Sequence, residues 1–365
     1  MKKYILILFI TTLGIHSALS QKVSLVFMGD IMGHSPQITS AKRDGGKYDY
    51  RECFQYMEPF FRSSEICVGN LEVTLAGAPY TGYPAFSSPD ELLYALHDAG
   101  VNMLVTANNH SCDKRKSGLE KTISAIDKLH ISRTGTFRDS VDKAANHPLL
   151  LSVYGIRLAF LNYTYGTNGI PVTKPNIVNH IDTTEMKADI KMAKEMEADK
   201  IIVLIHWGNE YQTKPNKMQT DLAKFLHSSG ADIIIGSHPH VIQPMHFIKD
   251  DKSETFVAYS LGNFISNQRN PYTDGGAVLR IELTKDDENT TITNLEYMLT
   301  WVHIPIVDGR KRYLVLPASI YDKKGVPEHV PVGYAGMFNY LKLAREVMKN
   351  NTNVPEIEEE WPLNN

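Results

Sequence analysis

Cysteine is scarce in this chain. Three cysteines, Cys53, Cys67 and Cys112, occur among 365 residues, and no two of them form a Cys-x-x-Cys pair. This spacing argues against a zinc site built from thiolates, and the odd number leaves at least one cysteine without an intramolecular partner. Cys112 lies two residues after His110 and suggests a nucleophile, but a lone thiol is more often a small buried side chain.

An excess of charge of one sign is also missing. The chain has 38 Lys and Arg against 41 Asp and Glu, which gives a net charge of −3. This balance gives no indication of nucleic-acid binding, and none is expected. Hydrophobic residues make up 42% of the sequence, as in ordinary globular proteins, and we find neither a fixed-period repeat nor a low-complexity tract. The length suits one large domain or two small ones.

Long apolar runs are absent apart from the amino terminus. Two lysines precede an apolar stretch at residues 4–15, which is short for a membrane span, and small residues follow at Ala18 and Ser20. The pattern predicts a signal peptide over residues 1–20, cleaved after Ser20, and export to the periplasm or cell surface. An uncleaved anchor is the alternative. No cysteine precedes Cys53, which argues against a lipoprotein anchor.

Two apolar, β-branched runs lie at the centre of the chain, at residues 201–205 and 233–235. Each predicts a strand, and each is followed by histidine: His206 after the first, His238 and His240 after the second. Residues 215–229 between them predict a helix that stops at Gly230. In open α/β sheets, ligands bind at the carboxyl ends of such strands.

The same pattern recurs elsewhere. Predicted strands at residues 23–28, 66–68, 101–106 and 256–261 run into polar groups, which are Asp30, Asn70 with Glu72, Asn109 with His110, and Asn263. A parallel sheet would bring these ends together at one edge. Each residue alone also fits a helix cap, a turn or core packing, but their joint occurrence favours a site. Residues 52–64 predict one continuous helix.

Imidazoles mixed with carboxylates and a carboxamide predict a metal centre. Without thiolates, this set suits Mn²⁺, Fe or Zn²⁺ better than Ca²⁺. More than four candidate ligands suggest two divalent metal ions, which can share a bridging carboxylate and generate hydroxide near neutral pH. A histidine outside the metal shell can protonate a leaving oxygen.

Six ordered motifs carry a family resemblance. They are GDIM at residues 29–32, GNLE at 69–72, NNHSCD at 108–113, HWGNEY at 206–211, GSHPHV at 236–241 and YSLGNF at 259–264. The sequence resembles the CapA/PgsA-type capsule and poly-γ-glutamate synthesis proteins, a branch of the calcineurin-like metallophosphoesterase superfamily, over residues 23–283. The resemblance implies an α/β fold, an αββα sandwich of two mixed β-sheets flanked by helices. We expect this domain over residues 22–325, followed by a C-terminal helix and polar tail over 326–365.

The resemblance also implies roles for individual residues. The implied metal ligands are Asp30, His34, Glu72, Asn109, His206, His238 and His240, with Glu72 as the bridge. His110 would assist the leaving group with Asp113 orienting its ring, and Asn70, Glu210 and Asn263 would contact substrate. Two departures stand out. His34 lies four residues after Asp30, where the superfamily usually has Asp-x-His, and Glu72 replaces the usual bridging aspartate.

These observations predict an exported metal-dependent hydrolase-like protein of capsule or poly-γ-glutamate type polymer biosynthesis. It would hydrolyse a phosphoester with a metal-activated hydroxide. Two alternatives stay open: a non-catalytic component of an envelope polymer synthesis or export complex, and an amide hydrolase acting on polyglutamate. Expected partners are an envelope polymer or phosphoester substrate and a membrane-bound synthesis complex. Specificity is expected in the loops at residues 76–86 and 163–179.

Overall fold

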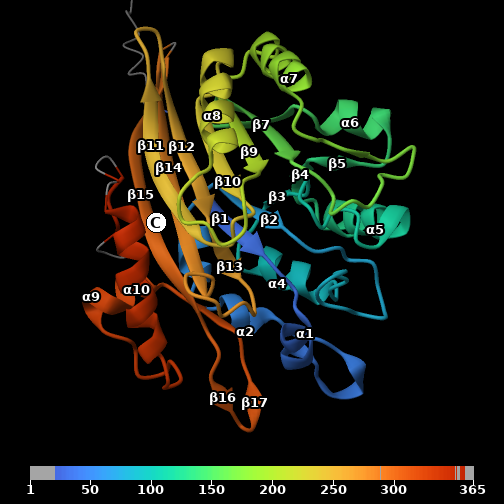
Figure 1. The fold of residues 1–365 in the computed structure, drawn as a ribbon, viewed down its shortest axis with the longest axis vertical. Helices are drawn as coiled ribbons and strands as arrows, with labels where there is room; N and C mark the ends of the chain where they lie inside the picture. The colour runs from blue at the N-terminus through green and yellow to red at the C-terminus, as the bar shows by residue number, and fades with distance from the viewer. Residues whose placement is uncertain (1–20, 288, 350, 352–353, 358–365) are drawn as a thin grey trace, which may run out of the picture.

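Two mixed β-sheets pack against each other in the computed structural model, which describes residues 21–287, 289–349, 351 and 354–357 (Figure 1). The predicted signal peptide, residues 1–20, and the last eight residues of the chain lie outside this part. None of the helices found in the described ranges is long and apolar enough to cross a membrane.

The first sheet combines parallel and antiparallel pairs. In spatial order its strands are β18 (Leu314–Leu316), β15 (Asn289–His303), β14 (Gly275–Asp286), β1 (Gln21–Ile31), β2 (Ile66–Leu71), β3 (Met103–Val105) and β4 (Ser132–Thr134), and β13 (Asn263–Ile265) also pairs with β1. Pairing is parallel from β1 to β4 and between β1 and β13, and antiparallel from β18 to β1.

The second sheet has a parallel centre and antiparallel edges. Its order is β11 (Ile242–Lys249), β12 (Glu254–Leu261), β10 (Ile233–Ser237), β9 (Lys200–His206), β7 (Ile156–Thr164) and β6 (Leu149–Val153). Only the outer pairs β11–β12 and β6–β7 are antiparallel. Two small ribbons complete the strands, β16 (Ile306–Val307) with β17 (Arg310–Lys311), and β5 (Thr136–Phe137) with β8 (Ile177–Val178).

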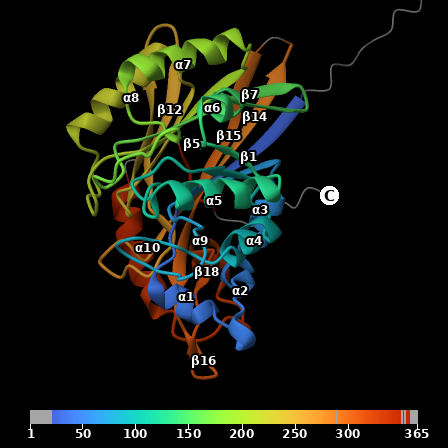
Figure 2. The same cartoon turned by 90° about the vertical axis from the view of Figure 1, so that its right-hand side faces the viewer.

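Helices flank both sheets, as the αββα prediction requires. They are α1 (Ser35–Ala41), α2 (Arg51–Phe54), α3 (Glu58–Arg62), α4 (Glu91–Asp98), α5 (Arg115–Lys128), α6 (Ser140–Asn146), α7 (Thr183–Glu195), α8 (Lys217–Ser229), α9 (Ala318–Lys324) and α10 (Ala335–Met348). In Figure 1, α7 and α8 lie opposite α9 and α10, and α4 and α5 face the viewer in Figure 2. The fold class predicted from the resemblance is therefore confirmed.

The core follows the two-residue period of the strands. Ile202 and Leu204 of β9 join the large cluster that includes residues of both sheets, such as Phe27 of β1. Their neighbours Val203 and Ile205 face the other way and pack with the apolar sides of α7 and α8. A strand buried on both faces reads as a continuous apolar run, which is why residues 201–205 were recognisable in the sequence.

The predicted strand–helix–strand unit is confirmed. Strand β9 leads through α8 to β10, which pairs with β9 in parallel. Asn216 caps α8 with a reciprocal bond to Gln219, and Gly230 ends the helix at a φ of 105°.

Two sequence expectations are corrected. The site residues do not share one parallel sheet, because β1, β2 and β3 belong to the first sheet whereas β9 and β10 belong to the second. The single helix predicted over residues 52–64 is interrupted between α2 and α3. Pro59 lies in the first turn of α3, where a missing N–H is tolerated, and it could not continue a helix from α2 without losing a backbone hydrogen bond.

The backbone at the end of β1 packs very closely against the backbone of Gly262. A Cβ added to Gly29 would lie 1.9 Å from the Gly262 carbonyl oxygen, and that oxygen accepts a 2.9 Å hydrogen bond from the Asp30 amide. Gly29→Ala should therefore push β1 away, lower stability by roughly 1–3 kcal/mol and displace the Asp30 carboxylate. Thermal unfolding and metal content measure the two effects. Gly166→Ala is the control, because a Cβ there meets nothing within 4 Å. An unchanged Gly29→Ala protein would show that the contact relaxes freely.

Candidate metal centre

The carboxyl ends of strands from both sheets meet at one buried centre. Asp30 of β1 lies opposite Asn70 of β2 and Asn263 of β13 in the first sheet. His206 of β9 lies opposite Ser237 of β10 in the second sheet. The centre is therefore fixed by sheet register on both sides.

Two carboxylates, those of Asp30 and Glu72, occupy the middle of this centre, and neither is exposed to solvent. The Asn70 amide donates to Asp30 Oδ1 at 2.8 Å and to Glu72 Oε2 at 3.2 Å, and so holds the pair together. Burial and the neighbouring charge of Asp30 raise the pKa of Glu72 well above its ordinary value. Burial acts on Asp30 in the same direction, but hydrogen bonds from His240 and Asn70 lower its pKa overall. Burial and the charge of Asp30 thus both oppose ionisation of Glu72.

Three histidines surround the carboxylates. His240 Nδ1 lies 3.0 Å from Asp30 Oδ2, while His206 Nε2 and His240 Nε2 lie 3.6 and 3.8 Å from Glu72 Oε1. Burial, reinforced by the other histidines, lowers the pKa of His206 well below its usual range and that of His238 to about 3. His206 and His238 are therefore neutral at physiological pH, the form in which imidazole binds metals.

The turn that carries His238 and His240 is strained. Both residues have positive φ, 95° and 57°, a region that costs a residue with a side chain about 1–3 kcal/mol. The His238 amide donates to Asp30 Oδ2 at 3.3 Å, which ties the turn of the second sheet to a carboxylate of the first. The turn brings the His238 ring to within 4.7 Å of the His206 ring, measured between centroids.

The donor set fits divalent metals. Two groups have ligand atoms within 4.8 Å of one another, Glu72 with His238 and His240, and Asp30 with Glu72 and His206. Glu72 belongs to both groups, which is the arrangement that a bridging carboxylate requires. Its Oε1 and the Nδ1 of His238 are buried and lack a hydrogen-bond partner. Such unpaired buried groups are costly, and a cation between them would satisfy both.

A second set of residues, from the loop after β3, borders the carboxylates. Asn109 Oδ1 lies 2.9 Å from His206 Nε2, so it faces the same space as the metal-ligand candidates. His110 Nδ1 lies 2.8 Å from Asp113 Oδ2, which also accepts a 2.7 Å bond from the Phe86 amide. The Phe86 ring meets His110 edge-on at 4.6 Å. This leaves Nε2 as the His110 nitrogen available to a substrate.

Four further sequence-predicted residues lie outside the two ligand groups. His34 lies outside both candidate groups; its Nδ1 is 3.2 Å from Gln37 Oε1, and burial lowers its pKa to about 4. Asn70 is buried and holds the carboxylates, and Asn263 Oδ1 lies 3.1 Å from His240 Nδ1. Glu210 is exposed. Of the residues predicted to contact substrate, only Glu210 is thus open to solvent.

The structure adds residues that the sequence did not identify as functional. Asn108 donates to Asn70 Oδ1 and to the Leu71 carbonyl, and Ser237 Oγ lies 3.0 Å from His206 Nδ1. Asn108 and Ser237 both lie inside the recognised motifs, so their motif positions could have identified them as candidates from the sequence. Tyr165 and Tyr211 are about two-fifths exposed, and their rings lie 4.6 Å from His238 and 6.2 Å from His240. Tyr165 comes from a loop that sequence analysis named only as a whole.

Comparison with known sequences gives one clear family match. Residues 24–268 match the family described as bacterial capsule synthesis protein PGA_cap. The capsule biosynthesis protein CapA of Bacillus anthracis is 29% identical over 289 residues, which cover 76% of this chain and 67% of that protein. The PGA biosynthesis protein CapA of Bacillus subtilis (strain 168) is 30% identical over 277 residues, covering 72% and 68%.

Solved structures show a weaker likeness. The NAD nucleotidase NadN of Haemophilus influenzae has a TM-score of 0.49 and 13% identity, covering 94% of this chain and 65% of that one. The calcineurin-like phosphoesterase YfkN of Bacillus subtilis has a TM-score of 0.45 and 14% identity, covering 77% and 90%. Neither score reaches 0.5, so the fold assignment rests on the sheet topology itself.

The shared position of Glu72 leads to a prediction about metal content. Glu72→Ala should weaken both ion sites together, whereas His238→Ala should mainly weaken one, because only Glu72 belongs to both groups. Elemental analysis of each variant measures the difference. Normal metal content in Glu72→Ala would mean that Glu72 is a turn residue and does not bridge two ions.

The pKa of Glu72 predicts a pH effect on the metal-free protein. A carboxyl with a raised folded pKa contributes stability below its unfolded pKa and loses it as pH rises through the folded value. Glu72→Gln cannot ionise, so chelator-treated Glu72→Gln should melt above the wild type by about 3 °C or more at alkaline pH, with a smaller gap at pH 5. If the difference in melting temperature does not grow with pH, Glu72 is already ionised at pH 5.

Proposed function

This chain belongs to the PGA_cap family of bacterial capsule synthesis proteins, and on that basis we propose that it is a metal-dependent hydrolase acting on a phosphoester in capsule-type polymer biosynthesis. The observation that carries the proposal is the position of Glu72 in two overlapping groups of buried ligands. A site that only stabilised the fold would need one such group, whereas two adjacent cations suit hydrolysis of a charged ester.

The residues that would hold the cations come from both sheets. They are Asp30, Glu72, Asn109, His206, His238 and His240. Bound divalent ions would lower the pKa of an attacking water and neutralise negative charge on the ester. The protein contributes a site whose imidazoles His206 and His238 are already neutral, so neither needs to lose a proton first.

His110 would handle the proton of the leaving group. Asp113 Oδ2 lies 2.8 Å from its Nδ1 and orients the ring, so that Nε2 can give a proton to the departing oxygen. The Phe86 amide fixes Asp113 through the same oxygen at 2.7 Å. The Phe86 ring packs against the His110 ring in a T-shaped contact. His110 therefore serves as general acid and Asp113 as its positioning residue.

Export is part of the proposal. The pattern in residues 1–20 supports secretion to the periplasm or cell surface, where an envelope polymer or its phosphoester precursor would be the substrate. A membrane-bound synthesis complex is the partner that this location suggests.

A substrate screen tests the function. Purified protein is incubated with Mn²⁺, Zn²⁺ or Fe²⁺ and assayed on phosphomonoesters, phosphodiesters and polyglutamate, with Glu72→Gln as the control. Metal-dependent phosphoester hydrolysis that Glu72→Gln abolishes supports the proposal. Shortening of polyglutamate without phosphoester cleavage would make the protein an amide hydrolase. No hydrolysis by metal-loaded protein would favour a non-catalytic role.

The general-acid role gives a sharper prediction. His110→Gln should keep the fold and the bound ions but lose turnover by about 10²–10⁴-fold on an alkyl phosphate. The loss should shrink on an aryl phosphate, because that leaving group needs less protonation. Asn109→Ala should lower metal content as well as rate, since Asn109 Oδ1 faces His206. Loss of metal from His110→Gln would identify His110 as a ligand, and unchanged rates on both esters would remove the general-acid role.

A further inference from the structure

Three exposed tyrosines border the metal centre. They are Tyr83, which is 75% exposed, and Tyr165 and Tyr211, which are 43% and 44% exposed. The Tyr165 ring lies 4.6 Å from the His238 ring, and the Tyr211 ring lies 6.2 Å from the His240 ring, measured between centroids. Exposed rings that gather at one place on a surface often mark a binding site. We call Tyr83, Tyr165 and Tyr211 the tyrosine rim.

Backbone hydrogen bonds hold two of these rings against the ligand histidines. The Tyr211 amide donates to the Pro239 carbonyl at 2.8 Å, inside the turn that carries two of the histidines, and the Tyr165 amide donates to the His206 carbonyl at 3.0 Å. Tyr211 has a φ of 64°, a conformation that glycine adopts easily and that a residue with a side chain adopts only at a cost. A ring kept on the surface at such a cost indicates that the ring has a function.

Tyr83 lies on a closed loop beside the proposed general acid. The backbones of Thr81 and Ser87 exchange two hydrogen bonds, of 3.0 and 2.8 Å, which close the loop around Tyr83. The Tyr83 ring lies 6.5 Å from the Phe86 ring, and the Phe86 ring lies 4.6 Å from the His110 ring. Tyr83 is therefore on the side of the centre where the leaving oxygen would receive its proton.

One carboxylate, that of Glu210, lies among these rings and is exposed. Burial, the Glu210 carboxylate and the Tyr83 phenol raise the pKa of Tyr211 to about 12, and burial and Glu210 also raise the pKa of Tyr165. Glu210 is therefore close to both rings, and Tyr83 is close to Tyr211. The rim thus offers aromatic faces and neutral hydroxyls together with one carboxylate acceptor.

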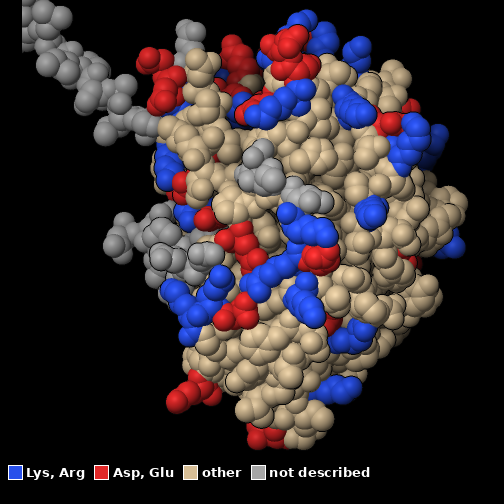
Figure 3. All heavy atoms as spheres, turned by 60° about the vertical axis from the view of Figure 1, so that its left-hand side comes forward, with Lys and Arg blue, Asp and Glu red and all other residues tan. Residues whose placement is uncertain are grey.

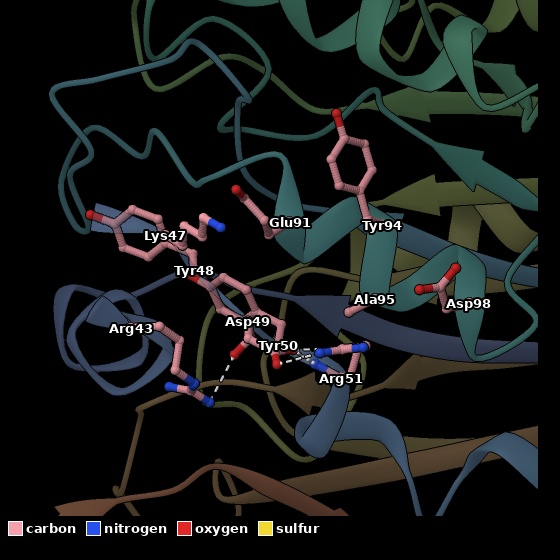
Figure 4. Close-up of a pocket in the computed structure, with 10 residues that line it drawn as sticks. All are labelled: Arg43, Lys47, Tyr48, Asp49, Tyr50, Arg51, Glu91, Tyr94, Ala95 and Asp98. Atoms are coloured by element: carbon pink, nitrogen blue, oxygen red, sulfur yellow. Dashed lines mark hydrogen bonds and ion pairs between the residues drawn. The ribbon is translucent and has the colours of Figure 1, made fainter. Parts of the chain in front are cut away.

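Two other surfaces serve for comparison. Figure 3 shows a face on which acidic and basic side chains lie interspersed, as is ordinary for a solvated surface. The cavity in Figure 4, of about 350 Å³, also contains tyrosines, among them Tyr48 and Tyr94. There, however, Asp49 pairs with Arg51 at 2.8 Å, and none of the lining residues belongs to the candidate metal-ligand groups.

We propose that the tyrosine rim binds a sugar ring carried by the phosphoester, so that the alcohol released by hydrolysis is a sugar. Aromatic faces pack against the C–H faces of a pyranose, and Glu210 can accept hydrogen bonds from its hydroxyls. Water adds its oxygen to phosphorus as a hydroxyl, the bond between phosphorus and the sugar oxygen breaks, and His110 gives that oxygen a proton. The proton left from the water restores His110. This substrate class rests on the phosphoester hydrolysis proposed above.

Kinetics on three esters test the rim. Metal-loaded protein is assayed on glucose 1-phosphate, on glycerol 3-phosphate, which has hydroxyls but no ring, and on phenyl phosphate, which has a flat ring without hydroxyls. Tyr83→Ala and Tyr211→Gly should each raise the KM for glucose 1-phosphate about tenfold, with kcat and both constants for glycerol 3-phosphate changed less than about twofold. Tyr211→Phe keeps the ring and should match the wild type. Glu210→Ala should raise the KM for glucose 1-phosphate but not for phenyl phosphate.

Tyrosines elsewhere provide matched controls. Tyr154 is 64% exposed and has a φ of 48°, so Tyr154→Gly removes an exposed ring from a similar backbone conformation. Tyr94→Ala removes a tyrosine from the cavity in Figure 4. Neither control should change the KM for glucose 1-phosphate. Because glycine suits the φ of Tyr211, unfolding cannot explain a loss of affinity in Tyr211→Gly.

A binding measurement separates the rim from the proposed hydrolysis. Metal-loaded His110→Gln protein, with and without Tyr211→Gly, is titrated with glucose 1-phosphate and glycerol 3-phosphate by calorimetry. Tighter binding of glucose 1-phosphate that Tyr211→Gly weakens about tenfold supports the rim, even where no phosphoester is cleaved and the proposed activity fails.

Three results would overturn the rim and leave the hydrolase proposal standing. The first is an equal Kd for glucose 1-phosphate and glycerol 3-phosphate. The second is a loss confined to phenyl phosphate in the rim variants, which would identify a flat aromatic group in place of the sugar. The third is an equal loss of affinity in Tyr154→Gly, which would show that the effect does not depend on position.

Discussion

The burial of two carboxylates side by side is the constraint on which the rest of this structure depends. Asp30 and Glu72 are both fully excluded from solvent, and two like charges in that position repel each other. Asn70 donates to both, and His240 compensates Asp30, but Glu72 Oε1 remains without a hydrogen bond. A proton or a cation can complete the balance, and the neutral imidazoles of His206 and His238 are suited to bind a cation.

The backbone around this centre adopts conformations that cost free energy. His238 and His240 adopt positive φ, which side chains disfavour, so that both rings reach the carboxylates. The end of β1 approaches Gly262 so closely that only glycine fits at Gly29. Such strain persists where the surrounding fold over-determines it, and it is found at functional sites. The two sheets together provide that support, since each contributes part of the ligand set.

Much of this arrangement was predictable from the sequence. Strands such as residues 201–205 are buried on both faces and read as unbroken apolar runs, and polar residues at their ends marked the centre. The pattern could not show which sheet each strand joins, because pairing depends on tertiary register. It also could not show that Asn70 joins the two carboxylates, or that Asn263 lies beside His240. Short elements such as α1 and the β16–β17 ribbon lack a readable period, so they were not predicted.

We infer that the fold is built to hold two divalent transition-metal ions. Elemental analysis of protein purified without chelators, and of the same protein after incubation with Mn²⁺, Zn²⁺ and Fe²⁺, tests it most directly. We expect two ions per chain, because two ligand groups share Glu72. A chain that stays metal-free after all three incubations would contradict it.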